Sequence, residues 1–416
     1  MPSDARPPLL PVADALSRIL DGLAMMPAED VSLTDALGRV TAEPIISRRT
    51  QPPVAVSSMD GYAVRAGDVA EAPVTLTRIG SAPAGTAFAG TVGPGQTVRI
   101  FTGGPVPDGA DAIVIQENVD APSEDDGVEI TVRSPGKPGQ NIRGAGLDFS
   151  EGDVGIPAGH VMTARDIGFA AAMDLPWIRV RQRPRIAILA TGDEIVRPGD
   201  PIGENQIVSS NSFALAATVT ICGGEPLNLG IAPDDIDGLR AMAQGAKGAD
   251  MLVTTGGASV GEHDLIQSAL GKDGLEVDFW RIAMRPGKPL IFGRIGDTPM
   301  LGLPGNPVST LVCATLFLRP AMFAMLGLAD ADRPNPRARL AVDLGENDER
   351  QDYLRARLTN DADGNLIAQP FGKQDSSMLS SLARSDCLIV RASHDPARRA
   401  GDEVEVLMLG DSLFRG

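Results

Sequence analysis

A regular alternation of strand-like and helix-like segments between Ile186 and about Leu328 constrains the fold of this chain more than any other feature. Apolar strand-like runs occupy residues 186–189, 227–231 and 251–254, and helix-like runs occupy residues 212–221 and 235–244. This alternation predicts a doubly wound parallel sheet with helices on its faces. In such sheets ligands bind beyond the carboxyl ends of the strands, so the loops at those ends are the first place to look for a site.

Three loops broken by glycine or proline follow apolar runs in this segment. They carry Gly256-Gly257-Ala258-Ser259 with Asp264, then Arg285-Pro286-Gly287-Lys288, then Pro304-Gly305-Asn306-Pro307. A strand that ends in small residues and opens a helix leaves backbone N–H groups unpaired, and such groups bind phosphate-like anions. These loops therefore predict a nucleotide or phosphate pocket.

Length and charge limit the classes of protein that fit. At 416 residues and 43% hydrophobic content, the chain is long enough for two to four domains with separate cores. Its 37 basic and 54 acidic side chains give a net charge of −17, which would repel the phosphate backbone of a nucleic acid. We therefore expect no nucleic-acid partner, and an anionic substrate has to be met by local basic residues.

The cysteines and the termini suggest a cytoplasmic protein. Cys222, Cys313 and Cys387 lie far apart without a CxxC spacing, so neither a disulfide framework nor a zinc site is expected. The N-terminus lacks the basic and then apolar pattern of a signal peptide. Residues 308–328 approach membrane length, but Arg319-Pro320 interrupts them. We expect a buried core helix there, no membrane association and a cytoplasmic location.

Changes in pattern divide the chain into four regions of a multidomain α/β and β protein. Residues 1–50 together with 150–185 form a helical and extended connector, residues 51–149 a small β domain, residues 186–329 the central doubly wound parallel-sheet domain, and residues 330–416 a C-terminal β domain. The amphipathic run that includes Val12, Leu16 and Ile19 predicts a helix at the start of the connector. A second helix is expected over residues 164–173.

Taken singly, the polar motifs leave alternatives open. Thr191-Gly192-Asp193-Glu194 could hold Mg²⁺ at a phosphate site or simply cap a helix. The Asp60-Gly61 step most often marks a tight turn. Arg285 and Lys288 flank a rigid Pro-Gly bend that could aim both cations at one anion, or they could be two solvated charges. His263 is better explained as a polar loop residue than as an acid-base catalyst.

The order of these motifs is more specific than any one of them. Ser58-Met59-Asp60-Gly61-Tyr62-Ala63, Thr102-Gly103, Asn141-Ile142-Arg143, Thr191-Gly192-Asp193-Glu194, Gly256-Gly257, Arg285-Pro286-Gly287-Lys288-Pro289 and Leu303-Pro304-Gly305-Asn306-Pro307 follow one another along nearly the whole chain. In this order they resemble the molybdopterin molybdenumtransferase family, which includes the C-terminal half of gephyrin. The resemblance implies molybdate insertion into adenylated molybdopterin with Mg²⁺ and release of AMP. It also implies an elongated cytoplasmic homodimer, a dimerisation role for the connector, and molybdopterin binding by the central domain.

The resemblance also implies roles for particular residues. It implies catalytic roles for Asp60, Glu194, Asp264, Arg285 and Lys288, substrate binding by Thr102, Arg143, Asp148, Asp234, Gly256, Gly257, Ser259, Pro304, Gly305, Asn306, Arg355 and Ser376, and metal binding by Glu194, Asp234 and Asp264. Arg143 and Arg355 are candidates for holding molybdate. The chain departs from the family pattern at Arg285, where many members carry lysine, and at Asp375, where glycine is usual. Arginine offers a planar fork instead of a point donor, and Asp375 adds negative charge beside Ser376.

Two other functions fit parts of the chain. The central domain alone also resembles molybdopterin adenylyltransferases, which attach AMP instead of releasing it, and such an enzyme is also a candidate partner. The segment around Ser58-Met59-Asp60-Gly61 disfavours that activity for this chain. A gephyrin-like scaffold that binds a partner peptide without turnover is the third class, and an apolar peptide groove would identify it.

Overall fold

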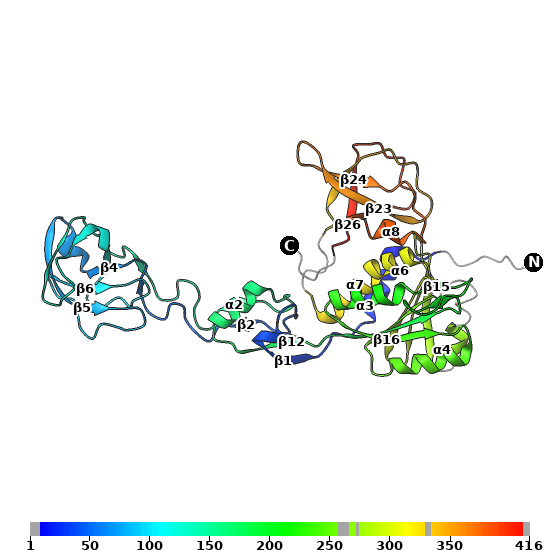
Figure 1. The fold of residues 1–416 in the computed structure, drawn as a ribbon, viewed down its shortest axis with the longest axis horizontal. Helices are drawn as coiled ribbons and strands as arrows, with labels where there is room; N and C mark the ends of the chain where they lie inside the picture. The colour runs from blue at the N-terminus through cyan, green and yellow to red at the C-terminus, as the bar shows by residue number, and fades with distance from the viewer. Residues whose placement is uncertain (1–8, 257–265, 272–273, 329–333, 411–416) are drawn as a thin grey trace, which may run out of the picture.

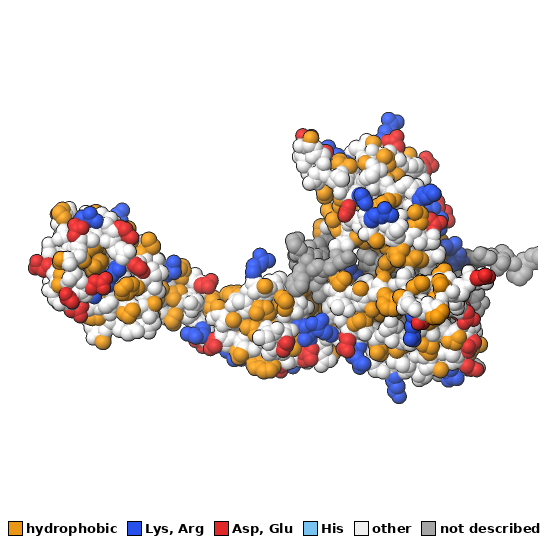
Figure 2. Space-filling model, in the orientation of Figure 1, with side chains coloured by type: hydrophobic (Ala, Val, Ile, Leu, Met, Phe, Trp, Pro, Cys, Tyr) orange, Lys and Arg blue, Asp and Glu red, His pale blue; other side chains and the backbone are white. Residues whose placement is uncertain are grey.

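The chain is extended, with its domains arranged along one long axis. A computed structural model describes residues 9–256, 266–271, 274–328 and 334–410. The small β domain lies at one end, the connector lies in the middle, and the central and C-terminal domains pack together at the other end (Figure 1). Only a narrow neck joins the small β domain to the connector (Figure 2).

The connector is built from segments that come from both sides of the small β domain in sequence. Its elements are β1 (Ala28–Ser32), β2 (Ile45–Ile46), β11 (Val154–Ile156), α2 (Ala164–Ala172) and β12 (Trp177–Arg181). β1 pairs with β12 and β2 pairs with β11, both antiparallel. The expected helix at 164–173 is confirmed as α2, which begins with a capping box between Thr163 and Asp166.

The first helix packs away from the rest of the connector. α1 (Val12–Asp21) confirms the amphipathic pattern, since Val12, Ala15 and Ile19 are its buried residues. These side chains belong to the same core cluster as Ile186 and Phe317 of the central domain. The N-terminal segment thus begins on the central domain and only then enters the connector.

The small β domain is a six-stranded sheet in the order β7-β4-β6-β5-β9-β8. Its strands are β4 (Gly61–Val64), β5 (Val74–Ala82), β6 (Gln96–Ile100), β7 (Ala112–Ile115), β8 (Val119–Asp120) and β9 (Glu129–Val132). Two antiparallel segments lead into and out of it, held together by pairing of β3 (Val56–Ser57) with β10 (Ile142–Arg143) and by a bridge between Gln51 and Phe149. We call these two segments, residues 47–57 and 141–153, the double tether.

The central domain contains the expected doubly wound sheet, but one edge of the sheet is antiparallel. The strand order is β16-β13-β17-β21-β20-β18, and the first four strands run parallel. The elements are β13 (Arg185–Thr191), α3 (Asn211–Ile221), β16 (Glu225–Ala232), α4 (Ile236–Ala243), β17 (Met251–Thr255), β18 (Leu275–Arg281), β20 (Pro289–Ile295) and β21 (Thr298–Leu303). Only Gly296-Asp297 separates β20 from β21, and so short a turn permits only antiparallel pairing. A sheet that is parallel throughout was therefore the wrong expectation for this edge.

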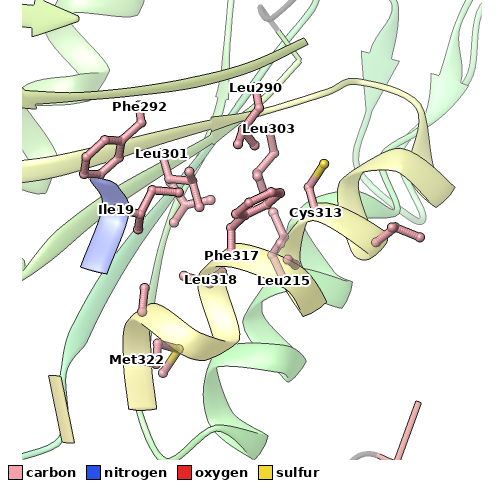
Figure 3. Packing of buried hydrophobic residues seen from close by; sticks show 14 of the residues in the cluster. Ile19, Leu215, Leu290, Phe292, Leu301, Leu303, Cys313, Phe317, Leu318 and Met322 are labelled. Carbon is pink, nitrogen blue, oxygen red and sulfur yellow. The ribbon is translucent and has the colours of Figure 1, made fainter. Parts of the chain in front are cut away.

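The apolar segment after β21 is a core helix, as its sequence predicts. It runs through α6 (Pro307–Cys313), a π-helical turn (Ala314–Leu318) and α7 (Arg319–Leu326). Among the described residues, Pro307–Leu326 is the one helix long and apolar enough to cross a membrane, and 67% of its most apolar window is buried inside the protein. Phe317 and Leu318 pack against Leu290, Leu301 and Leu303 of the sheet and against Ile19 of α1 (Figure 3).

The C-terminal domain is a barrel-like sheet that packs against the central domain. Its strands follow the order β19-β23-β24-β22-β26-β25, and an additional β23–β25 pairing closes the ring. The elements are β19 (Met284–Arg285), β22 (Arg337–Leu340), β23 (Gln351–Asn360), β24 (Leu366–Pro370), α8 (Leu379–Leu382), β25 (Cys387–Arg391) and β26 (Glu403–Met408). β19 belongs in sequence to the central domain, so its parallel pairing with β23 joins the two domains through backbone hydrogen bonds.

Candidate functional site

Two glycine loops meet at the carboxyl edge of the parallel strands. Gly256 has φ +84°, and a Cβ atom there would lie 2.4 Å from the Thr191 carbonyl oxygen at the end of β13. A Cβ on Gly305 would lie 3.6 Å from the Gly256 Cα atom. Only glycine permits this approach at residue 256. The loops after β13, β17 and β21 therefore form one surface, as the alternation predicts.

Asn211 ties these loops together and was missed by the sequence reasoning. It is the first residue of α3, and its side-chain Nδ2 donates to Thr255 Oγ1 at 2.9 Å and to the Gly305 carbonyl oxygen at 2.8 Å. Thr255 Oγ1 in turn donates to the Pro304 carbonyl oxygen at 3.3 Å. The signal in the sequence was the polar run 209–212 at the start of the helix, since polar side chains at helix N-termini commonly make hydrogen bonds.

Two threonine hydroxyls lie buried beneath this surface. Thr191 is 4% exposed and Thr254 is fully buried, and neither Oγ1 atom has a hydrogen-bond partner in the described part of the chain. The Thr191 hydroxyl lies 2.7 Å from the point where a Gly256 Cβ would stand. A buried hydroxyl without a partner is costly, so these groups favour the presence of a polar ligand or further polar chain at this edge.

Acidic side chains border the same edge. The backbone N–H of Asp193 donates to Asp234 Oδ2 at 3.3 Å, and that of Asp234 donates to Asp193 Oδ1 at 3.2 Å. Glu194 is exposed, and its carboxylate folds over Gly192. The described residues contain no group of three or more His, Cys, Asp or Glu side chains placed to hold a metal. Asp264, Gly257 and Ser259 lie outside the described residues.

The C-terminal domain reaches the third loop through Ser376. Asn306 Nδ2 donates to Ser376 Oγ at 3.0 Å, and the Val308 N–H donates to the Ser376 carbonyl oxygen at 3.0 Å. The Asp375 carboxylate next to Ser376 accepts through Oδ1 from the hydroxyl and the N–H of Ser377, which stabilise its charge. The Ser377 hydroxyl is the main reason that the pKa of Asp375 lies below its usual value.

Arg355 lies in a different environment from the one expected for a molybdate contact. It is 1% exposed, and its guanidinium donates to Gln374 Oε1 and to the carbonyl oxygens of Lys373 and Met378. Burial lowers the pKa of this arginine. Its observed contacts hold the loop that carries Ser376, so it positions that loop and does not present its charge to solvent.

Arg285 also differs from the expected anion-binding side chain. Its guanidinium donates to Asp348 Oδ2 at 2.9 Å and to the buried carboxylate of Asp352. The hydrogen bond that Arg285 donates to the Asp352 carboxylate is the main cause of the raised pKa of Arg285. Because both carboxylates belong to the C-terminal domain, Arg285 joins the two domains beside the β19–β23 pairing.

We expect Arg285→Ala to destabilise the contact between the central and C-terminal domains. The change leaves Asp352, whose side chain is 7% exposed, without its cation. Because the Arg285 side chain is 44% exposed, the expected loss in the free energy of unfolding is roughly 1–3 kcal/mol, less than for a fully buried pair. Arg337→Ala, which breaks an ion pair with Glu403 whose side chains are both 63% exposed, is the control and should change stability little. Equal denaturant midpoints for the two variants would contradict this assignment.

Unlike Arg285, Lys288 of the second loop is available to bind an anion. It is half-buried, and its ammonium group has no hydrogen bond or ion pair in the described ranges. Gly287 precedes it with φ +111°, and a Cβ there would lie 2.5 Å from the Cys313 sulfur of α6. The loop is thus packed directly against the helix whose N-terminal loop carries Asn306.

The small β domain holds a second group of predicted residues. Asp60 Oδ1 accepts from the backbone N–H of Thr102 at 2.7 Å and from its hydroxyl at 2.8 Å, and the backbone bond is the main cause of the lowered pKa of Asp60. Arg143 and Asp148 are exposed and lie on the double tether. This group lies at the opposite end of the chain from the central sheet (Figure 1), so one subunit does not bring the two groups together.

Comparisons with known proteins cover almost the whole chain. Three family descriptions match it: the MoeA N-terminal region (domain I and II) over residues 10–173, a probable molybdopterin binding domain over 187–324, and the MoeA C-terminal region (domain IV) over 337–409. The molybdopterin molybdenumtransferase of Haemophilus influenzae is 33% identical over 401 residues, which cover 96% of this chain and 98% of the relative. The corresponding Nostoc protein is 35% identical over 391 residues, covering 92% and 88%. A crystal structure of a Pyrococcus horikoshii MoeA protein matches with a TM-score of 0.83 at 29% identity, covering 96% of this chain and all of that one.

Proposed function

The chain belongs to the molybdopterin molybdenumtransferase family, and from this premise we propose that molybdenum is inserted into molybdopterin at the carboxyl edge of its central sheet. The meeting of the Gly256 and Gly305 loops around Asn211 carries this assignment of the site. Adenylyltransferase activity and a scaffold without turnover are not favoured, since relatives that match over nearly the full length are named molybdenumtransferases.

The substrate that suits this edge is an adenylated molybdopterin, with molybdate as the second substrate. The Gly305 loop offers backbone N–H groups, and Lys288 offers a cation without a competing carboxylate among the described residues. These groups would bind the phosphate oxygens and stabilise the charge that develops when the phosphoanhydride is cleaved. A molybdopterin adenylyltransferase would supply this substrate.

The acidic side chains at this edge suit Mg²⁺. Mg²⁺ prefers one or two carboxylates together with substrate phosphate oxygens, and it does not need a cage of protein ligands. Asp193 and Asp234 each use one carboxylate oxygen for the other's backbone N–H, and the second oxygen of each has no partner among the described residues, while Glu194 is exposed beside them. Glu194 and Asp234 would hold the ion, with Asp264 as the third proposed ligand. The bound ion would neutralise phosphate charge during cleavage.

The activity can be tested by following AMP. We expect AMP to be released only when adenylated molybdopterin, molybdate and a divalent cation are all present, because the carboxylates at the site repel a polyphosphate-like substrate in the absence of the cation. Chromatography of the nucleotide after incubation with each component left out gives the measurement. Full AMP release in excess chelator, or without molybdate, would rule out this mechanism.

The remaining residues fit a site shared between two subunits. Asp60 and Thr102, with Arg143 and Asp148, lie at the far end of the chain from Glu194, and a two-fold dimer would bring the small β domain of one subunit to the central domain of its partner. The protein would then be an elongated homodimer. A cytoplasmic location is consistent with the three free, buried cysteines.

A further inference from the structure

A cavity of about 340 Å³ lies at the first turn of α3, the turn whose Asn211 bonds the glycine loops. It is open to solvent on one side, and its walls are Arg197 just after β14 (Ile195–Val196), Ser209 just after β15 (Ile207–Val208), the start of α3 and β16. We call it the Arg197 cavity, and the side chains that matter in it are Arg197, Ser209, Ser212, Phe213 and Asn228, with the backbone at Gly230. Its volume lies within the range of small-molecule sites.

The aromatic ring in this cavity is not part of a core. Phe213 is 54% exposed although it is the third residue of a helix whose inner face is buried. Because the phenylalanine ring is exposed to water, a flat ligand that covers it gains favourable contact area without displacing other side chains of the protein. Stacking of a nucleobase on an aromatic side chain is worth about 1–3 kcal/mol.

The polar groups of the cavity are arranged for an anion and a hydrogen-bonding ring. Gly230 has φ +96°, and a Cβ there would lie 3.2 Å from Arg197 Nη2, so glycine lets the guanidinium lie against the strand. Arg197 has no ion pair in the described part of the chain, although acidic residues outnumber basic ones 54 to 37. Asn228 Oδ1 accepts from the Gly230 N–H at 3.0 Å, which leaves its NH₂ group to donate.

We propose that the Arg197 cavity binds a fused nitrogen heterocycle that carries a phosphate monoester. The ring stacks on Phe213, the Asn228 amide donates to its edge, and Arg197 pairs with the phosphate. This inference rests on the proposed function, because both halves of an adenylated molybdopterin have this chemistry. Asn211 connects the two places, since it begins the same helix and holds the glycine loops.

Calorimetric titration of the full-length protein with AMP and, separately, with neopterin monophosphate tests the proposal. We expect Phe213→Ala and Arg197→Gln each to weaken binding of one of these ligands about tenfold, in line with the loss of a stacking or charge contact. The ligand that is affected identifies the half of the substrate that the cavity holds. Ile236→Ala and Arg165→Gln, which remove an exposed apolar and an exposed basic side chain elsewhere, are the matched controls and should bind as wild type.

The outcomes separate this inference from the proposed function. If wild-type protein releases AMP from its substrate but Phe213→Ala and Arg197→Gln bind both ligands as tightly as wild type, the cavity is not a subsite and the function stands. Failure of the wild type to bind either ligand also overturns the inference. Phe213→Trp adds a local readout, since a ring stacked on the new indole should quench its fluorescence, whereas a ligand bound only at the glycine loops should not.

Discussion

Glu194→Ala is expected to lower molybdenum insertion by at least about a hundredfold, the scale of losing one group that stabilises charge in a transition state. Glu194 is exposed in the loop after β13. Its backbone carbonyl oxygen accepts a hydrogen bond from the Ile207 N–H at 2.7 Å. Alanine keeps that bond and removes only the carboxylate. The variant should therefore lose activity while its cooperative thermal unfolding stays close to that of the wild type.

A nearby glutamate provides the control for this prediction. Glu204 is exposed in the loop between β14 and β15, ten residues after Glu194, so Glu204→Ala should keep full activity. Asp264→Ala should behave like Glu194→Ala. Loss of cooperative unfolding in Glu194→Ala would show that the side chain supports the fold, and full activity in a folded variant would remove it from the site.

Mixing two inactive variants is expected to restore about a quarter of wild-type activity. Asp60→Ala and Glu194→Ala should each be inactive as homodimers, because each damages both composite sites. Random reassembly of an equal mixture gives half mixed dimers, and each mixed dimer has one intact site of two. Activity measured after unfolding and reannealing, with native mass spectrometry to count mixed dimers, tests this directly.

The matched control uses two changes at one position. A mixture of Asp60→Ala with Asp60→Asn should stay inactive, because every site then receives a damaged small β domain. If the Asp60→Ala and Glu194→Ala mixture is equally inactive although mixed dimers are present, each site is built within a single subunit.

The fold was largely predictable because its periodic patterns are local. The apolar runs at 186–189 and 251–254 follow Arg185 and Asp250 and lead to Thr191 and Thr255, and both are buried strands in the structure. The helix at 307–326 was also predictable, since Arg319-Pro320 argued against a membrane span. The antiparallel edge formed by β18 and β20 was not, because strand direction depends on how each connection closes in space.

The contacts of the site residues were harder to predict because they depend on partners distant in sequence. Arg285 meets Asp348 and Asp352, more than sixty residues later, and no local pattern distinguishes such an arginine from one that binds an anion. Arg355 is buried by a loop that lies about twenty residues further along. Asn211 is a similar case. The sequence places it ahead of a predicted helix, but it does not indicate the hydrogen bonds to the two distant loops.

The double tether determines how the small β domain can move. A single linking chain would let a domain rotate about every bond, but here two antiparallel segments are held by the β3–β10 pairing, the Gln51–Phe149 bridge and a bond from the Ser47 N–H to the Asp153 carbonyl oxygen at 2.9 Å. A two-stranded ribbon bends across its flat face and resists rotation of one end against the other. Asp60 and Thr102 are therefore restricted to a narrow range of positions, which in the proposed dimer would raise their effective concentration at the central domain of the second subunit.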